Sequence, residues 1–213
     1  INRIFVLRQE RKFNQAEVEL KEALLKPENS QVYPELYHLL GIILIDMARY
    51  DEAVSAFQES LSLKPDEPSV LCNLAVALKN LGNIEGAKVA LERAIELNPE
   101  YPEALNNLGN IYKNLGMFDE ARACYEKALK IKPDYLEVKI NLANLLADTT
   151  DIVKAKQILV EIVNTNPNST IARKALARVC IKVGDYNSAE ANYRFALMLD
   201  PYDSEVYSEL AGL

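Results

Sequence analysis

The sequence predicts an all-α fold, a solenoid of antiparallel helix pairs, because three sets of residues recur along it with one fixed spacing. The first set consists of prolines 34 residues apart, at Pro65, Pro99, Pro133, Pro167 and Pro201. The second consists of leucines with the same step, each followed by a small residue. The leucines are Leu40, Leu74, Leu108, Leu142, Leu176 and Leu210, and the small residues are Gly41, Ala75, Gly109, Ala143, Ala177 and Ala211. The third set consists of alanines at Ala53, Ala87, Ala121, Ala155 and Ala189.

The first helix of each unit is predicted from the spacing of its apolar residues. Leu105, Leu108, Gly109 and Tyr112 are separated by three, one and three residues, which places all four on one face of a helix. Gly116 follows that run and can adopt the positive φ that ends a helix. The sequence therefore predicts a first helix that stops at about Gly116.

A second helix follows directly in the same unit. Asp119 is expected to cap it, and its apolar stripe is formed by Ala121, Tyr125, Ala128 and Leu129, before Pro133 ends the unit. Small residues at the crossing allow the two backbones to approach closely, while large residues fill the space beside them. One such pair cannot bury its apolar face alone, so neighbouring pairs are expected to stack.

The repeats divide the chain into one predicted domain that covers residues 1–213. Residues 1–32 form a partial or irregular first repeat, in which Phe13, Ala16 and Leu20 belong to a second helix. Five complete repeats follow, at 33–66, 67–100, 101–134, 135–168 and 169–202, and residues 203–213 form the first helix of a further repeat. Within the first helices we number positions from Pro34, Pro68, Pro102, Leu136, Thr170 and Ser204.

Four residues depart from the repeat pattern. Ala48 and Thr150 stand where the other turns have glycine, and a β-branched threonine is strained at positive φ, so the turn from Asp148 to Asp151 is expected to differ. Lys139 and Arg173 stand at position four, where other repeats carry tyrosine or leucine. Their aliphatic stems can cover the core while the charged groups reach water.

Composition excludes several classes of function. The 213 residues carry 24 basic and 31 acidic side chains, a net charge of −7, which argues against a general nucleic-acid binder. No apolar run approaches the length needed to cross a bilayer, so membrane insertion is not expected. Three cysteines without a CxxC spacing predict no disulfide framework, which favours a reducing, cytoplasmic location. The sequence begins at Ile1 rather than methionine, so a targeting signal could lie outside it.

The repeated pattern resembles the tetratricopeptide repeat family, which has an aromatic residue or leucine, Leu-Gly, a tyrosine or leucine, a glycine, an alanine, an aromatic, an alanine and a closing proline. The resemblance covers nearly all of the chain. It implies a right-handed superhelix whose first helices line a concave groove, and a scaffold that binds a polypeptide segment in that groove.

Catalytic and metal chemistry are not predicted. The chain has one histidine, His38, and three scattered cysteines, from which neither a hydrolytic triad nor a metal site can be assembled. It has no phosphate-binding glycine motif either. Acidic pairs such as Asp51 and Glu52 or Asp119 and Glu120 could be read as acid/base machinery, but each pair opens a second helix, where capping and the helix dipole explain it. We therefore expect no enzyme activity, no cofactor and no metal.

The open face of the first helices is predicted from positions two, five, six, nine, twelve and thirteen, which point away from the packed face. The residues that we read on this face are His38, Leu39, Cys72, Asn73, Lys79, Asn80, Asn106, Asn107, Asn110, Lys113, Asn114, Asn141, Asn144, Lys174, Arg178 and Lys182. Asn73, Asn107 and Asn141 share position six in consecutive repeats, and we call them the asparagine ladder. An amide both donates and accepts hydrogen bonds, which suits an extended peptide backbone. The ladder is similar to one in the O-linked N-acetylglucosamine transferases, although asparagine is also common at these positions of the repeat.

A second resemblance concerns the carboxylate clamp of co-chaperones that bind the C-termini of heat-shock proteins. The positions that match are Asn106 and Asn110, then Asn141, then Lys174 and Arg178. Four of these five residues agree with the family pattern, and Asn106 replaces a lysine. Lys174 and Arg178 lie four residues apart and can bring two cations to one anion. The resemblance implies a partner with an acidic segment or a C-terminal carboxylate, and scattered basic residues are the alternative.

Two other functions stay open. The last predicted helix carries Tyr207, Leu210 and Leu213 without a second helix to cover them, which favours self-assembly into a homo-oligomer. Alternatively, the chain is the substrate-recruiting arm of a larger enzyme such as a glycosyltransferase.

Overall fold

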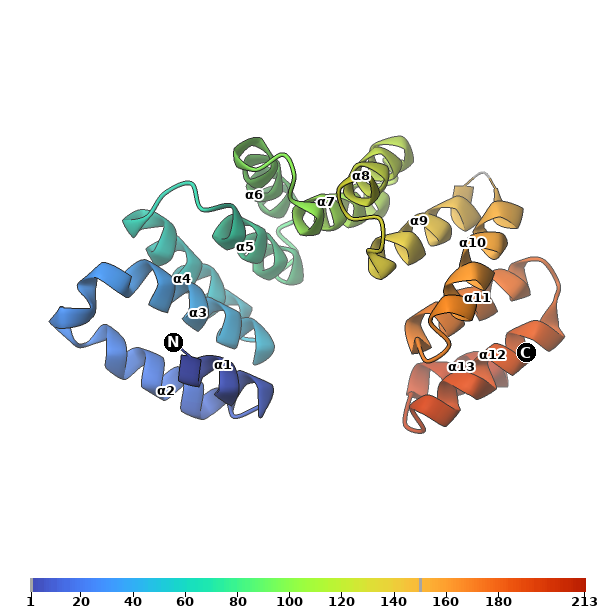
Figure 1. The fold of residues 1–213 in the computed structure, drawn as a ribbon, viewed down its shortest axis with the longest axis horizontal. Helices are drawn as coiled ribbons and strands as arrows, with labels where there is room; N and C mark the ends of the chain where they lie inside the picture. The colour runs from blue at the N-terminus through green and yellow to red at the C-terminus, as the bar shows by residue number, and fades with distance from the viewer. Residues whose placement is uncertain (1, 150) are drawn as a thin grey trace. The chain divides into compact units, whose positions relative to one another are not determined.

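A computed structural model describes residues 2–149 and 151–213, and every regular element within these residues is a helix. The elements are α1 (Asn2–Gln9), α2 (Phe13–Leu24), the 3₁₀ helix η1 (Pro27–Val32), α3 (Tyr33–Asp46), α4 (Tyr50–Leu63), α5 (Pro68–Asn80), α6 (Ile84–Leu97), α7 (Pro102–Asn114), α8 (Phe118–Ile131), α9 (Leu136–Thr149), α10 (Ile152–Thr165), α11 (Thr170–Lys182), α12 (Tyr186–Leu199) and α13 (Ser204–Ala211). Odd-numbered helices are the first members of the pairs and even-numbered helices the second (Figure 1). The predicted all-α repeat fold is confirmed.

The chain divides into two compact units, residues 1–111 and 112–213, with the boundary inside α7. In the first unit α3 packs against α4, and α5 packs against both α4 and α6. In the second unit α9 packs against α10, α11 against α10 and α12, and α13 against α12. Each unit is thus a stack of helix pairs, and the prediction of one continuous domain stays a prediction.

Each unit has an apolar core supplied by the repeated positions. Leu20, Ile43 and Phe57 belong to the core of the first unit, and Leu159 and Tyr193 to that of the second. All five alanines of the third set are fully buried, at 0% exposure. They lie at helix crossings where a larger side chain would hold the backbones apart.

The need for a small residue after each leucine can be explained directly at Gly41. A methyl group placed there would lie 2.4 Å from one ring carbon of Phe57 and 2.7 Å from two others. Phe57 is itself fully buried on α4. The aromatic ring of the second helix therefore occupies the space that a side chain at position eight would need.

The turns inside the helix pairs share one backbone conformation. Gly82, Gly116 and Gly184 have φ between 75° and 80°, as predicted for Gly116, and Ala48 adopts the same region with φ 57°. Arg11 does so too, with φ 56°, which the sequence did not suggest. In each turn a backbone N–H binds the carbonyl five residues earlier at 2.8–3.0 Å. The donors are Lys12, Arg49, Asn83, Met117, Asp151 and Asp185, and the acceptors are Leu7, Leu44, Leu78, Tyr112, Leu146 and Cys180. This is the bond of the Schellman motif.

The expectation of an altered turn at Asp148 to Asp151 rests on Thr150, which lies outside the described residues. The flanking bond from Asp151 to Leu146 matches those of the other turns.

The predicted cap at Asp119 is wrong. Helix α8 begins at Phe118 after Met117, which provides no side-chain cap, and Asp119 lies in the first turn. Side-chain caps occur at the residue equivalent to Met117 in three other repeats, namely Asn83, Asp151 and Asp185. Because Met117 directly follows the positive-φ residue Gly116, the turn fixes which residue can cap α8, and Asp119 instead favours the helix through its charge near the N-terminus.

Candidate functional site

The open face of the first unit is built from α3, α5 and the part of α7 up to residue 111. Most of its predicted residues are only partly exposed, because neighbouring first helices shield one another, although Asn80 at the end of α5 is exposed. Asn73, Asn107 and Asn110 are half-buried, and Asn106 is only 2% exposed. Asn106, which replaces the lysine of the clamp pattern, therefore belongs to the interior of the repeat stack.

Two members of the asparagine ladder bind the preceding repeat. Nδ2 of Asn73 lies 2.9 Å from Nε2 of His38, and Nδ2 of Asn107 donates to Sγ of Cys72 at 3.5 Å. In both pairs the partners are 35 residues apart, so a position-six amide meets the position-five side chain of the previous repeat. The ladder thus connects first helices to one another, a role that the sequence did not reveal.

Apolar side chains share this face with the asparagines. Leu39, Ile42 and Ile45 of α3 are half-buried and pack against the core of the first unit. Val76 and Lys79 of α5, with Asn107 of α7, line a small hollow. Ile42, Ile45 and Val76 occupy positions nine and twelve, which the helical spacing places on the open face, but they were not among the residues that we read there. The face accordingly offers apolar contact next to amide groups.

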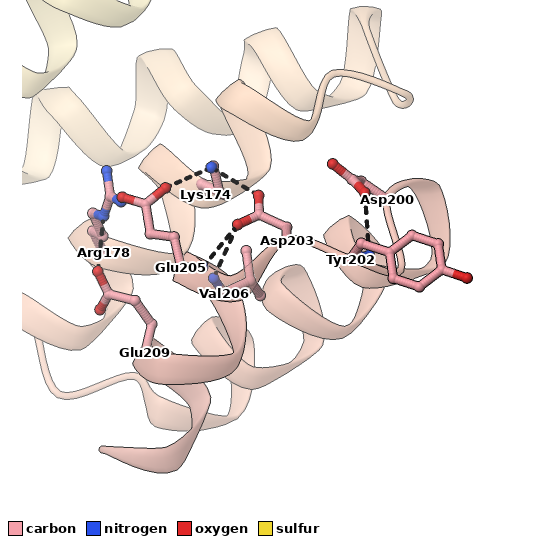
Figure 2. A network of polar contacts seen from close by, with 8 residues as sticks. All are labelled: Lys174, Arg178, Asp200, Tyr202, Asp203, Glu205, Val206 and Glu209. Atoms are coloured by element: carbon pink, nitrogen blue, oxygen red, sulfur yellow. Dashed lines mark hydrogen bonds and ion pairs between the residues drawn. The ribbon is translucent and has the colours of Figure 1, made fainter.

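In the second unit Lys174 and Arg178 of α11 meet carboxylates from α13 and the residue before it (Figure 2). Nζ of Lys174 lies 2.9 Å from Oδ2 of Asp203 and 2.6 Å from Oε2 of Glu205. Arg178 contacts Oε1 of Glu205 at 2.5 Å and Oε1 of Glu209 at 3.2 Å. Both cations of the predicted clamp are therefore already paired within the chain.

These ion pairs favour the charged forms of both partners. Hydrogen bonds to Glu205 and then Asp203 raise the pKa of Lys174 above its ordinary value. The hydrogen bond to Lys174 and the charge of Arg178 lower the pKa of Glu205, and the bond to Lys174 lowers that of Asp203. Asp203 also caps α13, accepting from the backbone N–H groups of Glu205 and Val206. Lys174 therefore pairs with the residue that caps α13.

A second ion-pair group lies on the same face, one repeat earlier. Asp148 accepts from Nζ of Lys182 at 2.5 Å and lies 3.2 Å from Nζ of Lys113. All four cations that we read on the open face of this unit therefore meet a carboxylate of a neighbouring repeat. Asn141 and Asn144 of α9 lie half-buried on the same helix as Asp148. This face therefore carries amide groups beside ion pairs, in which carboxylates largely neutralise the charge of the lysines and the arginine.

The described residues can be compared with what metal binding and thiol chemistry require. No group of three or more His, Cys, Asp or Glu side chains in that part of the chain is arranged to hold a metal ion. The three cysteines are free thiols, and burial raises the pKa of each, to about 11 for Cys124. Thiols with raised pKa values are poor nucleophiles at neutral pH. Across residues 2–149 and 151–213, no helix has both the length and the apolar character to span a membrane.

Comparisons with known proteins agree with this architecture. Models of the tetratricopeptide repeat match residues 44–96 and 102–135, and a model described as a TPR repeat matches residues 77–116. A search of curated proteins finds no match.

Among solved structures, a thermophilic tetratricopeptide repeat protein of Thermus thermophilus is 23% identical with a TM-score of 0.74, over 84% of this chain and 97% of that one. Pseudomonas aeruginosa pilF is 21% identical with a TM-score of 0.78, over 99% and 94% of the two chains. YrrB, described as a TPR protein with an unusual peptide-binding site, is 15% identical with a TM-score of 0.60, over 84% and 91%.

Proposed function

This chain is a tetratricopeptide repeat protein, and we propose that it is a non-enzymatic protein–protein interaction scaffold whose open face binds an extended segment of a partner polypeptide. One observation carries the proposal: half-buried amides and apolar side chains lie next to one another on the open face of the first helices. A peptide in extended conformation presents backbone N–H and C=O groups together with side chains on alternate sides. Amides suit the former and apolar contacts the latter.

The hydrogen bonds that Asn73 and Asn107 make within the chain support peptide binding. The amides of Asn73 and Asn107 each have two N–H groups and a carbonyl oxygen with two lone pairs, so one bond to the preceding repeat leaves most of their capacity unused. Asn73 and Asn107 use that one bond to fix their side chains in place. A pre-oriented amide loses less conformational entropy when a ligand binds. YrrB, which is described as a TPR protein with an unusual peptide-binding site, is a precedent for peptide recognition by this fold.

Lys174 and Arg178, the basic end of the open face, can bind a ligand carboxylate only in exchange for a carboxylate of the chain itself. A ligand carboxylate that reaches these side chains has to replace Glu205 or Glu209, so one ion pair is lost for each one formed. The net gain from exchanging partly exposed ion pairs is small. We therefore propose that an acidic segment or a C-terminal carboxylate adds little affinity, and that amides and apolar groups supply most of it.

The experiment selects ligands from a random twelve-residue peptide library displayed on phage, with the chain immobilised at pH 7.5. Recovered peptides are synthesised with a fluorophore, and their affinities are measured by anisotropy. Asn73→Ala combined with Asn107→Ala should weaken binding about tenfold or more, because each lost hydrogen bond costs roughly 0.5–1.5 kcal/mol. Asn164→Ala is the matched control, since Asn164 is exposed on the second helix α10. Equal affinity for the double variant and the control contradicts the proposal.

A second candidate function is self-assembly through α13. Tyr207 is 55% exposed and Leu213 42% exposed, and Tyr202, just before the helix, is 92% exposed. A second copy of this chain could cover these side chains. A role as the substrate-recruiting arm of a larger enzyme such as a glycosyltransferase stays a further prediction. Such an arm has to bind a polypeptide, so the peptide selection tests that requirement too.

A further inference from the structure

We infer that His38 is a positioning residue of the open face: the unprotonated Nε2 of its ring holds the amide of Asn73 in one orientation, and protonation of the ring reverses that amide. As far as peptide binding is concerned, the inference rests on the proposed function. The amide orientation itself is a property of the free chain, so the two can be tested separately.

The ring of His38 is held from two sides. Its centroid lies 5.9 Å from that of Phe57 in an edge-on arrangement, and its Nε2 lies 2.9 Å from Nδ2 of Asn73. Phe57 is fully buried on α4, so it forms a fixed wall for the ring. Because Nδ2 of an amide only donates, Nε2 is the acceptor and the proton of the neutral ring sits on Nδ1. The carbonyl oxygen of Asn73 is therefore the group that points away from His38.

Protonation removes the acceptor. Both nitrogens of a charged imidazole carry hydrogen, so Nε2 can then bind only an oxygen. The amide of Asn73 satisfies this by turning about its last side-chain bond, which places Oδ1 on the ring and Nδ2 on the opposite side. The group offered to a peptide at this point of the ladder changes from an acceptor to a donor. A peptide N–H that fits Asn73 at neutral pH would face another N–H in acid.

The surroundings of the ring set the pH range. Burial is the largest influence and lowers the pKa of His38, while the charges of Glu67 and Glu35 oppose it. Glu35 lies on α3 and Glu67 just before α5, and the latter is paired with Lys64 at the end of α4 at 2.6 Å. The same hollow that His38 lines contains these three charged side chains. The reversal is therefore expected below the ordinary histidine pKa of about 6.5.

The next repeat supplies an internal control. Asn107 makes the equivalent bond, but its partner is the thiol of Cys72, whose pKa is raised chiefly by burial. This thiol keeps its proton throughout the acid range. Asn107 therefore reports any general effect of pH on the repeat stack, and Asn73 reports the effect of His38.

The first arm of the test uses the free chain and no ligand. In the ¹³C,¹⁵N-labelled protein, the ring Cδ2 shift should identify the Nδ1–H tautomer of His38 at pH 8. Between pH 8 and pH 4.5 the side-chain NH₂ signals of Asn73 should move with the same midpoint as the ring, while those of Asn107 stay in place. His38→Gln, which keeps an acceptor, should abolish the titration of Asn73 without unfolding the protein. An Nε2–H tautomer at pH 8, or Asn73 signals that ignore the ring, overturns the inference.

The second arm uses a library-selected peptide that contains no Asp, Glu or His. Its affinity for the wild-type chain should fall about three- to tenfold between pH 7.5 and pH 5, the loss expected for one hydrogen bond, and should stay constant for His38→Gln. A peptide that loses affinity equally with both chains overturns the role of His38 in binding. If the library yields no peptide, the proposed function fails, while the signals of Asn73 still decide the orientation of the amide.

Discussion

The contact between Gly41 and Phe57 gives a prediction that can be worked through from atomic distances. In Gly41→Ala the new methyl carbon meets ring carbons at 2.4–2.7 Å, whereas carbon atoms normally approach to about 3.5–4.0 Å. The ring is fully buried on α4 and also contacts His38, so it has little room to move. Overpacking of this kind costs about 1–3 kcal/mol, and replacing a mid-helix glycine returns up to about 1 kcal/mol. The net loss of stability should be about 1–2 kcal/mol.

The next repeat of this chain has a larger residue at position eight and a smaller one on the second helix. Position eight carries Ala75 in the next repeat, and the residue equivalent to Phe57 is there Leu91, also fully buried. Phe57→Leu alone should cost roughly 1–2 kcal/mol through lost apolar burial and the cavity left behind. Combined with Gly41→Ala, it reproduces a pair that the protein already uses. The double variant should therefore be more stable than the sum of the two losses predicts, by about 1 kcal/mol.

Urea denaturation followed by far-ultraviolet circular dichroism measures all four free energies of unfolding at one temperature. The reasoning is refuted if Gly41→Ala is at least as stable as the wild type, since the ring then yields without cost. It is equally refuted if the two substitutions are additive within about 0.3 kcal/mol, because the contact would then carry no energy of its own.

Three further predictions concern the turns, one ion pair and the exposed end. Ala48→Gly should raise the free energy of unfolding by about 0.5–1 kcal/mol, because it removes the strain of φ 57°. Gly116→Ala should lower that free energy by about 1 kcal/mol, and urea denaturation distinguishes the two signs. Hydrogen bonds to Lys156 and Ser188 lower the pKa of Asp185 to about 2, so its stabilising contribution is present above the ordinary aspartate value near 4 and is lost as the pH falls through about 2. Asp185→Asn should remove that part of the acid dependence of thermal unfolding, and an unchanged pH profile would count against it. Light scattering at two concentrations should show association if α13 is a self-assembly surface, and Tyr207→Ala should reduce it; a monomer at both concentrations rules the surface out.

The fold was predictable from sequence because each repeat tests the assignment of the others. Any one apolar run is ambiguous, but the 34-residue spacing identifies equivalent positions in every repeat, and the fully buried alanines confirm that reading. Two features of the turns were not obtained from the sequence. Arg11 adopts positive φ before the regular spacing begins, and Asp119 was assigned a cap that belongs to a residue two positions earlier.

The candidate site was less predictable because its contacts join different repeats. Helical periodicity placed Asn73 and Lys174 on the open face, but it carries no information on which side chains meet across neighbouring first helices. The partners lie far along the chain, 35 residues away for Asn73 and 29 and 31 residues away for Lys174. Such pairs become apparent only when the stacking geometry is known, and both proved to be occupied within the chain.

These contacts imply that binding and repeat stacking draw on the same side chains. In the first unit, position-six amides of one repeat bind position-five groups of the previous one, and in the second unit lysines and an arginine bind carboxylates in a comparable way. A ligand that takes over such a group weakens a link between repeats, whereas a ligand that uses the remaining capacity of a fixed amide does not. The first kind of binding therefore has the weaker net affinity, and any peptide that binds the folded chain stabilises it according to its concentration relative to Kd. A peptide that binds through the asparagine ladder should therefore raise the thermal midpoint of the chain. An acidic peptide of the same length, which has to displace Glu205 and Glu209, should raise it far less at equal concentration, and a larger rise for the acidic peptide would show that the cations are not held by those carboxylates in solution.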